Sequence, residues 1–171
     1  MEKASRIAVG IKHFFTEPAD MRTRLNALMG IVNPILEEKG IPAAMAIFES
    51  KGHMAFDKGP WTVEVLNKLL SVERLTEEQF QEVVSCVYHE ARHAEQFWTI
   101  ARMKAGEGND ARWIISNLRV PPEVAELAVQ QPIKSGTAEA AAAAEWYESV
   151  FGKGALHRKN VYANMDRAAE T

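Results

Sequence analysis

The segment from Thr76 to Ala105 constrains the fold more than any other, because its pattern predicts one unusually long helix. Thr76 and Gln79 form the ends of a Thr-Glu-Glu-Gln capping box, with the threonine as N-cap. Gly106 and Gly108 follow and end the helix. An apolar stripe at helical spacing comprises Phe80, Val83, Val84, Val87, Ala91, Ala94 and Trp98.

The remaining sequence predicts several shorter helices and three short strands. The strands are expected at 44–49, 53–57 and 61–65, with glycine-containing turns between them that favour hairpins. The further helices are expected at about 20–38, 111–118, from 121 onward, from Thr137 to Gly152, and over 154–168. Pro34 is expected to kink or split the first of them. These elements predict an α+β fold that is mostly helical, with a small antiparallel β-sheet.

Composition limits the classes of function. The 171 residues fit a single domain, 1–171, which can also be a piece of a longer secreted protein. The net charge of −3 offers no basic surplus for nucleic acid. No apolar run approaches membrane-spanning length, and the N-terminus does not resemble a cleavable signal peptide. Cys86 is the only cysteine, so no internal disulfide forms. We expect synthesis in the cytoplasm, which leaves open export by a route without a cleavable signal.

His89, Glu90 and His93 form an H-E-x-x-H motif near the middle of the long predicted helix. Residues four apart on a helix lie about 40° round from each other and one turn along, so both imidazoles can bind one ion. Zinc suits such ligands, and it lowers the pKa of a bound water, whose proton Glu90 can then accept. The motif predicts a zinc site with His89 and His93 as ligands and Glu90 as the general base.

A catalytic zinc site needs a third protein ligand from elsewhere in the chain. The metzincin extension of the motif is absent, because Gln96 and Thr99 stand at its glycine and third histidine. The candidates are His13, His53, His157 and the acidic residues of the alanine-rich segment, Glu139, Glu145 and Glu148. Glu139 is preferred, because it shares a predicted inward face with Ala143, Trp146 and Val150, and Glu145 is next. Glu139 also has a purely structural explanation, since an acid in the first turn stabilises a helix.

Four further predictions concern residues around the proposed site. An oxyanion stabiliser is expected among Tyr147, His157 and Tyr162, and His157 is preferred. Gln96 lies one turn beyond His93, where it can support the site or line it. Cys86 is expected to be a small buried residue. The strand from Trp61 to Val65 can be the sheet edge that binds an extended peptide.

Two segments resemble a known family. The sequence "YHEARHAEQFW", followed some fifty residues later by "AEAAAAAEWYESVFG", is similar to the gluzincin metallopeptidases. It resembles more specifically the zincin-like toxin domains found in type VI secretion spike (VgrG) proteins and Rhs-type toxins. The resemblance covers roughly residues 54–152. It implies zinc ligands at His89, His93 and Glu139, with Glu90 as the base. The acidic residues that often follow the third ligand are missing here, since alanines follow Glu139.

The resemblance also implies a biological setting and leaves three functions open. The protein would be an effector delivered into a target cell, with an immunity protein and a secretion spike as partners. The first hypothesis is a zinc metallopeptidase that acts on a peptide or protein substrate. The alternatives are a metal-dependent hydrolase of a non-protein amide, such as cell wall, and a non-catalytic zinc-binding structural module.

Overall fold

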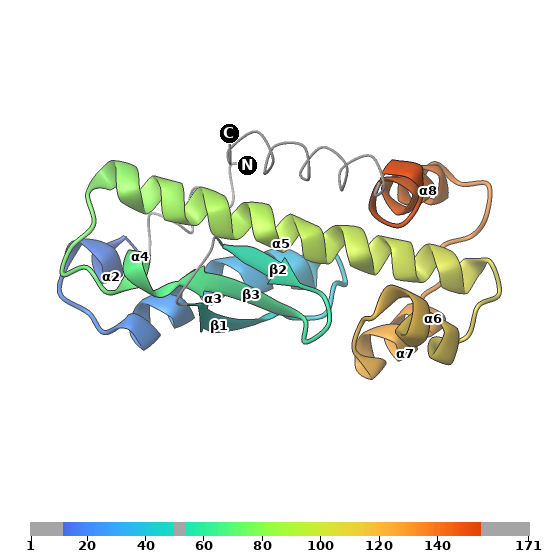
Figure 1. Ribbon diagram of the computed structural model, residues 1–171, viewed down its shortest axis with the longest axis horizontal. Helices are drawn as coiled ribbons and strands as arrows, with labels where there is room; N and C mark the ends of the chain where they lie inside the picture. The colour runs from blue at the N-terminus through green and yellow to red at the C-terminus, as the bar shows by residue number, and fades with distance from the viewer. Residues whose placement is uncertain (1–11, 50–53, 155–171) are drawn as a thin grey trace, which may run out of the picture.

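A single long helix organises the fold, as expected from the sequence (Figure 1). The computed structural model describes residues 12–49 and 54–154. Helix α5 spans Glu77–Gly106 and begins with the predicted capping box at Thr76. The Gln79 backbone N–H donates to Thr76 Oγ1 (3.2 Å), and the Thr76 N–H donates to Gln79 Oε1 (2.9 Å). Both ends of this helix were therefore predictable from local chemistry.

Most other described residues are also helical, which confirms the mostly helical α+β prediction. The helices besides α5 are α2 (His13–Thr16), α3 (Met21–Glu38), α4 (Asn67–Leu70), α6 (Ala111–Leu118), α7 (Pro122–Gln130) and α8 (Ala138–Val150). Pro34 does not split α3. The side chain of Asn33 bonds to Ala44, donating to its carbonyl (3.2 Å) and accepting from its N–H (3.0 Å). The helix predicted over 154–168 lies outside the described residues, apart from its first position.

The three strands form a mixed sheet, and the prediction of an antiparallel one is wrong. The strands are β1 (Met45–Glu49), β2 (Ala55–Asp57) and β3 (Thr62–Leu66), in the order β1-β3-β2. β1 pairs parallel to β3, whereas β2 pairs antiparallel to it. The reason is burial: four of the five β3 residues are buried, so this strand takes the centre. The turn residues predicted hairpins between strands that are consecutive in sequence, but they do not show which strands pair in the sheet.

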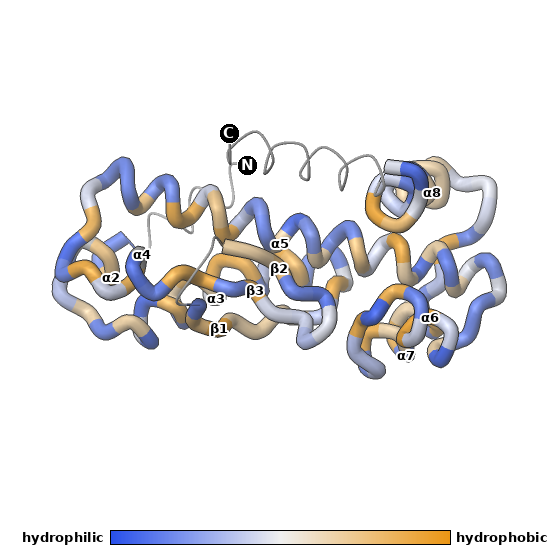
Figure 2. Tube along the Cα trace, in the orientation of Figure 1, coloured by the Kyte–Doolittle hydropathy of each residue, from blue (hydrophilic) through white to orange (hydrophobic). Residues whose placement is uncertain are grey.

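The core lies along α5 (Figure 1). The helix packs against α3 and the sheet over its first two thirds, and against α6, α7 and α8 towards its C-terminal end. In the view of Figure 1, α8 lies above α5, and α6 and α7 lie below it. Polar and apolar residues alternate along the helix, as Figure 2 shows, and Ala94, Ile100 and Ala101 are fully buried. Among the described residues, no helix is both long enough and apolar enough to cross a bilayer.

Gly106 gives a testable prediction for the end of α5. A Cβ atom at this position would lie 1.8 Å from the carbonyl oxygen of Ile133, which the loop before α8 places against the helix. We expect Gly106→Ala to lower the free energy of unfolding by about 1–3 kcal/mol, as overpacking does. Gly30→Ala is the matched control, because a Cβ there meets nothing within 4 Å, and it should stabilise the protein by about 0.5–1 kcal/mol. Urea unfolding of the two variants measures both effects, and equal stabilities would contradict the prediction.

Candidate metal centre

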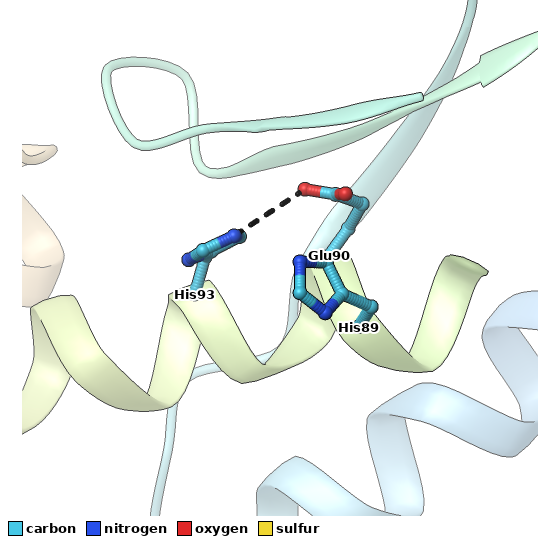
Figure 3. Close-up of side chains that lie close together, drawn as sticks. All are labelled: His89, Glu90 and His93. Carbon is cyan, nitrogen blue, oxygen red and sulfur yellow. Dashed lines mark ion pairs between the residues drawn. The ribbon is translucent and has the colours of Figure 1, made fainter. Parts of the chain in front are cut away.

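Three potential metal ligands lie together on α5. The ligand atoms of His89, Glu90 and His93 are all within 4.8 Å of one another (Figure 3). The two imidazole rings are 5.1 Å apart between centroids and nearly perpendicular, and His93 Nε2 is 3.9 Å from Glu90 Oε2. The Glu90 side chain is only 13% exposed, while His93 is 39% exposed. The helical spacing thus produces the juxtaposition that the motif predicts, and the cluster faces solvent on one side.

Gln96 fixes the orientation of His93. The Nδ1 atom of His93 is 2.9 Å from Gln96 Oε1. An amide oxygen only accepts hydrogen bonds, so Nδ1 must carry the proton and donate it. In the neutral ring, Nε2 then has a free lone pair, and Nε2 is the nitrogen that faces Glu90. Metal-binding histidines commonly have such a partner on the nitrogen that does not bind the metal.

A cavity of about 550 Å³ opens beside the three residues. Met54, Ala55 and Phe56 of the β2 segment form one side, and α8 contributes a second side. The remaining lining comes from α5 and α8: His89, Glu90, His93, Gln96, Phe97, Trp146, Ser149 and Val150. The volume falls within the usual range for pockets that hold small molecules or single side chains. A candidate metal centre therefore has adjoining room for a substrate.

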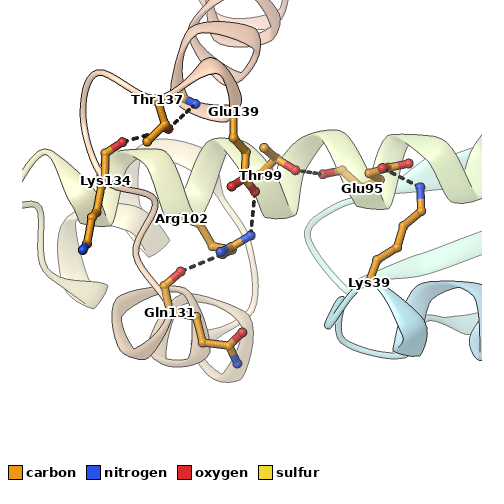
Figure 4. Close-up of polar contacts among 9 residues, drawn as sticks. Lys39, Glu95, Thr99, Arg102, Gln131, Lys134, Thr137 and Glu139 are labelled. Atoms are coloured by element: carbon orange, nitrogen blue, oxygen red, sulfur yellow. Dashed lines mark hydrogen bonds and ion pairs between the residues drawn. The ribbon is translucent and has the colours of Figure 1, made fainter.

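The structure does not bring Glu139 to the two histidines. Its carboxylate accepts a hydrogen bond from Arg102 Nη1 (2.9 Å), as Figure 4 shows. Arg102 follows His93 by nine residues, which is about 13 Å along the helix axis. The face of α8 was predicted correctly, since Ala143 is buried and Trp146 and Val150 line the cavity. The C-terminal end of α8 lies near the histidines, however, and Glu139 is at the other end.

Among the described residues, Glu145, Glu148 and His13 are not part of the ligand cluster. Glu145 is exposed, and the Glu148 carboxylate lies against Gly152. Tyr147 stacks on Phe151 and contacts Lys104, whose Nζ is 4.0 Å from the ring centroid. His13 lies in α2. The residues outside the described ranges are His53, His157 and Tyr162, so His157 stays a prediction.

Cys86 is not part of the cluster, and it packs against the core, but it is less buried than the predicted small buried residue. It is half-buried one turn before His89. Burial raises the pKa of its thiol, and the carboxylates of Glu82 and Glu90 raise that pKa further. Because the thiolate is the form that binds metals, a raised pKa disfavours Cys86 as a ligand.

The sheet edge beside the cavity is β2, not the segment from Trp61 to Val65. The prediction of an edge strand at Trp61–Val65 is wrong, because β3 is the central strand. Among the described strands, β2 pairs with β3 alone, and its residues Ala55 and Phe56 line the cavity. The sequence predicted a strand at 53–57 but not that it would lie at the edge of the sheet, since strand order depends on tertiary packing.

Comparisons with protein-family models, with curated proteins and with solved structures find no match to this chain. The arrangement of the side chains must therefore carry the functional argument.

Proposed function

We propose that this protein is a zinc-dependent hydrolase that cleaves peptide bonds, with the cluster on α5 as its catalytic centre. The observation that carries the proposal is the convergence of two imidazoles and one carboxylate within 4.8 Å, beside an open cavity. H-E-x-x-H motifs have this arrangement on a helix in zinc peptidases. The motif lies in the interior of α5, where the backbone holds it rigidly.

The donor set fits zinc. Imidazole nitrogen and carboxylate oxygen are common ligands of Zn²⁺, with bonds of about 2.0–2.2 Å. Two nitrogens bound to one tetrahedral zinc ion lie about 3.3–3.4 Å apart. The ligand atoms, which lie within 4.8 Å of one another, would move closer by side-chain rotation to reach that separation. The hydrogen bond from His93 Nδ1 to Gln96 leaves Nε2 as the nitrogen that would bind the ion.

In the proposed reaction, each side chain has a distinct task. A bound zinc ion would polarise the scissile carbonyl and lower the pKa of the attacking water towards about 7. Glu90 accepts the proton that this water loses as the new C–O bond forms. The same carboxylate then delivers the proton to the amine that leaves when the C–N bond breaks. The partial burial of Glu90 keeps it beside the histidines. An extended substrate would pair with the edge of β2 that no described strand covers, next to the cavity.

The non-catalytic zinc module is the second candidate function, and one observation favours it. Glu90 is itself within ligand distance of the histidines, and no carboxylate from α8 joins them in the described part of the chain. If Glu90 binds the ion directly, it cannot act as a base, and the site would be structural. The proposed setting as a delivered bacterial effector rests on the sequence resemblance, and toxicity on expression in bacteria would test it.

Zinc binding by histidine variants tests the proposed centre. We expect the purified wild-type protein to hold about one zinc per chain, and His89→Ala and His93→Ala to lose it. His13→Ala is the matched control, because His13 lies in α2 and should leave zinc content unchanged. His157→Ala tests the remaining histidine candidate for the third ligand, and Glu139→Ala should keep zinc, because Glu139 pairs with Arg102. Elemental analysis after dialysis gives the stoichiometry. Wild-type protein without zinc, or with zinc that both histidine variants retain, would refute the proposal.

Replacing Gln96 tests the orientation of His93. We expect Gln96→Leu to weaken zinc binding by about 10–100-fold, as the loss of such hydrogen-bond partners does. Gln81→Leu is the control, since Gln81 lies on the same helix and bonds to Glu77 instead. Competition with a chelator of known affinity measures both dissociation constants. Equal affinities in the two variants would show that Gln96 does not support the site.

A further inference from the structure

The wall of the cavity next to His93 is aromatic and comes from three elements. Phe56 lies on β2, Phe97 on α5 and Trp146 on α8, and Met54 and Val150 complete the apolar lining. Phe97 follows His93 by one turn of the same helix, so the aromatic wall lies directly next to the metal centre. A substrate side chain that enters the cavity would thus meet three aromatic rings.

Ring contacts fix this wall in place. The rings of Phe56 and Phe97 stack with centroids 6.3 Å apart, and Phe56 meets Trp61 edge-on at 5.1 Å. Phe97 in turn meets Phe151 edge-on at 6.1 Å. These separations are typical of favourable aromatic pairs. A preformed aromatic wall binds a bulky apolar group without first having to order itself.

Lys58 places a positive charge behind this wall. Its Nζ atom lies 5.5 Å from the centroid of Phe97 and 5.2 Å from that of Phe151, and it donates to the carbonyl of Leu118 (2.5 Å). Burial lowers the pKa of Lys58, and the nearby Arg119 lowers it further, while Asp57 raises it. The ammonium therefore lies over the electron-rich ring of Phe97, and its charge disfavours a second cation close to that ring.

We infer that the cavity binds a bulky uncharged side chain of the substrate, aromatic or branched aliphatic, and that Lys58 makes it discriminate against basic side chains. This inference rests on the proposed peptidase function, since it assigns the substrate class to the same site. Among the described residues that line the cavity, Glu90 is the one acidic group, and it lies against His93 at the metal centre. The described residues at the aromatic end of the cavity thus offer no carboxylate to pair with a substrate lysine or arginine.

Hydrolysis of a peptide series tests the inference. The peptides differ at one position, which holds Phe, Leu, Ala or Lys. In one set this position precedes the scissile bond, and in a second set it follows that bond. We expect kcat/KM for Phe and Leu to exceed that for Ala and Lys by about tenfold or more. Lys58→Met should raise the relative rate for Lys, whereas Lys58→Arg, which keeps the charge, should not. Phe97→Ala should remove the advantage of Phe over Ala. Rates that do not depend on the side chain would overturn the inference while leaving the peptidase proposal intact.

A binding measurement keeps the inference testable if the peptides are not cleaved. The chain contains four tryptophans, so 5-fluorotryptophan labelling gives four ¹⁹F signals, and Trp146→Phe assigns the one in the cavity. We expect N-acetyl-phenylalaninamide and N-acetyl-leucinamide to shift the Trp146 signal, and N-acetyl-lysinamide to leave it unchanged. If the phenylalanine and leucine compounds shift the Trp146 signal but no peptide of the series is hydrolysed, the peptidase proposal is refuted. The same result would support the proposed selectivity of the cavity for uncharged side chains. A lysine compound that shifts Trp146 as much as the phenylalanine compound would overturn the inference.

Discussion

Glu90→Gln should abolish peptide hydrolysis and leave zinc binding nearly intact. The amide has almost the same shape as the carboxylate but cannot accept the proton of the attacking water. General-base catalysis contributes about 10²–10⁴-fold to rate, so we expect kcat to fall by about that factor. Zinc stays bound because His89 and His93 are unchanged in this variant. The assay measures cleavage of a quenched fluorescent peptide mixture alongside zinc content.

The control for this variant is Glu82→Gln, two turns earlier on the same helix, where the side chain is exposed. It should match the wild type in both rate and zinc content. Three results would contradict the proposal. Retained hydrolysis in Glu90→Gln would show that Glu90 is not the base. Loss of zinc would make Glu90 a ligand and favour the structural zinc module. Absence of hydrolysis in zinc-loaded wild-type protein would exclude the peptidase function for the peptides tested.

Arg24 has the second large expected effect, on stability. Its side chain is fully buried, yet within the described part of the chain no carboxylate accepts a hydrogen bond from it. The guanidinium donates to backbone carbonyls of two segments that are far apart in sequence, residues 14–17 and 70–73. These carbonyls belong to Phe14 (2.9 Å), Glu17 (3.4 Å), Leu70 (2.8 Å), Val72 and Glu73 (2.7 Å). Arg24 therefore joins α3 to the end of α2 and to the residues at and after the end of α4.

We expect Arg24→Met to lower the free energy of unfolding by about 3–5 kcal/mol. The methionine has a similar apolar stem but leaves several buried carbonyls without donors, and each hydrogen bond from a charged group contributes about 1.5–3 kcal/mol. Such a loss is a large part of a typical stability of about 5–15 kcal/mol. Urea unfolding followed by circular dichroism gives the value.

Arg22→Met is the matched control for this substitution, because Arg22 lies on the same helix and is exposed. It should change stability by less than about 0.5 kcal/mol. Arg24→Lys should fall between the two, since an ammonium keeps the charge but has three donors in place of five. Equal stability of Arg24→Met and Arg22→Met would show that the buried hydrogen bonds contribute no net stability.

Local features of the molecule were predictable because they depend on residues that are close in sequence. The capping box at Thr76 and Gln79 involves groups three residues apart, and it appears with both predicted hydrogen bonds. The clustering of His89, Glu90 and His93 likewise follows from the helical repeat alone. Gln96 was expected near His93 for the same reason.

Features that depend on how elements pack were not predictable in this way. The three strands were found near their expected positions, but their order depends on which strand is most buried, and this placed β3 between β1 and β2. Arg24 lies among apolar residues on the inward face of α3, and its sequence neighbours do not indicate the carbonyls that surround it.

The sequence by itself determined the long helix α5, the face of α8 that points inward and the three potential ligands on one turn. Only the tertiary structure decided where along α5 the helix α8 packs. This position decides which residues of α8 lie near the histidines. Helical periodicity fixes the direction of a side chain around its own axis, but it says nothing about position along a neighbouring helix. For this reason Trp146 and Val150 line the cavity, while Glu139, on the same face, pairs with Arg102.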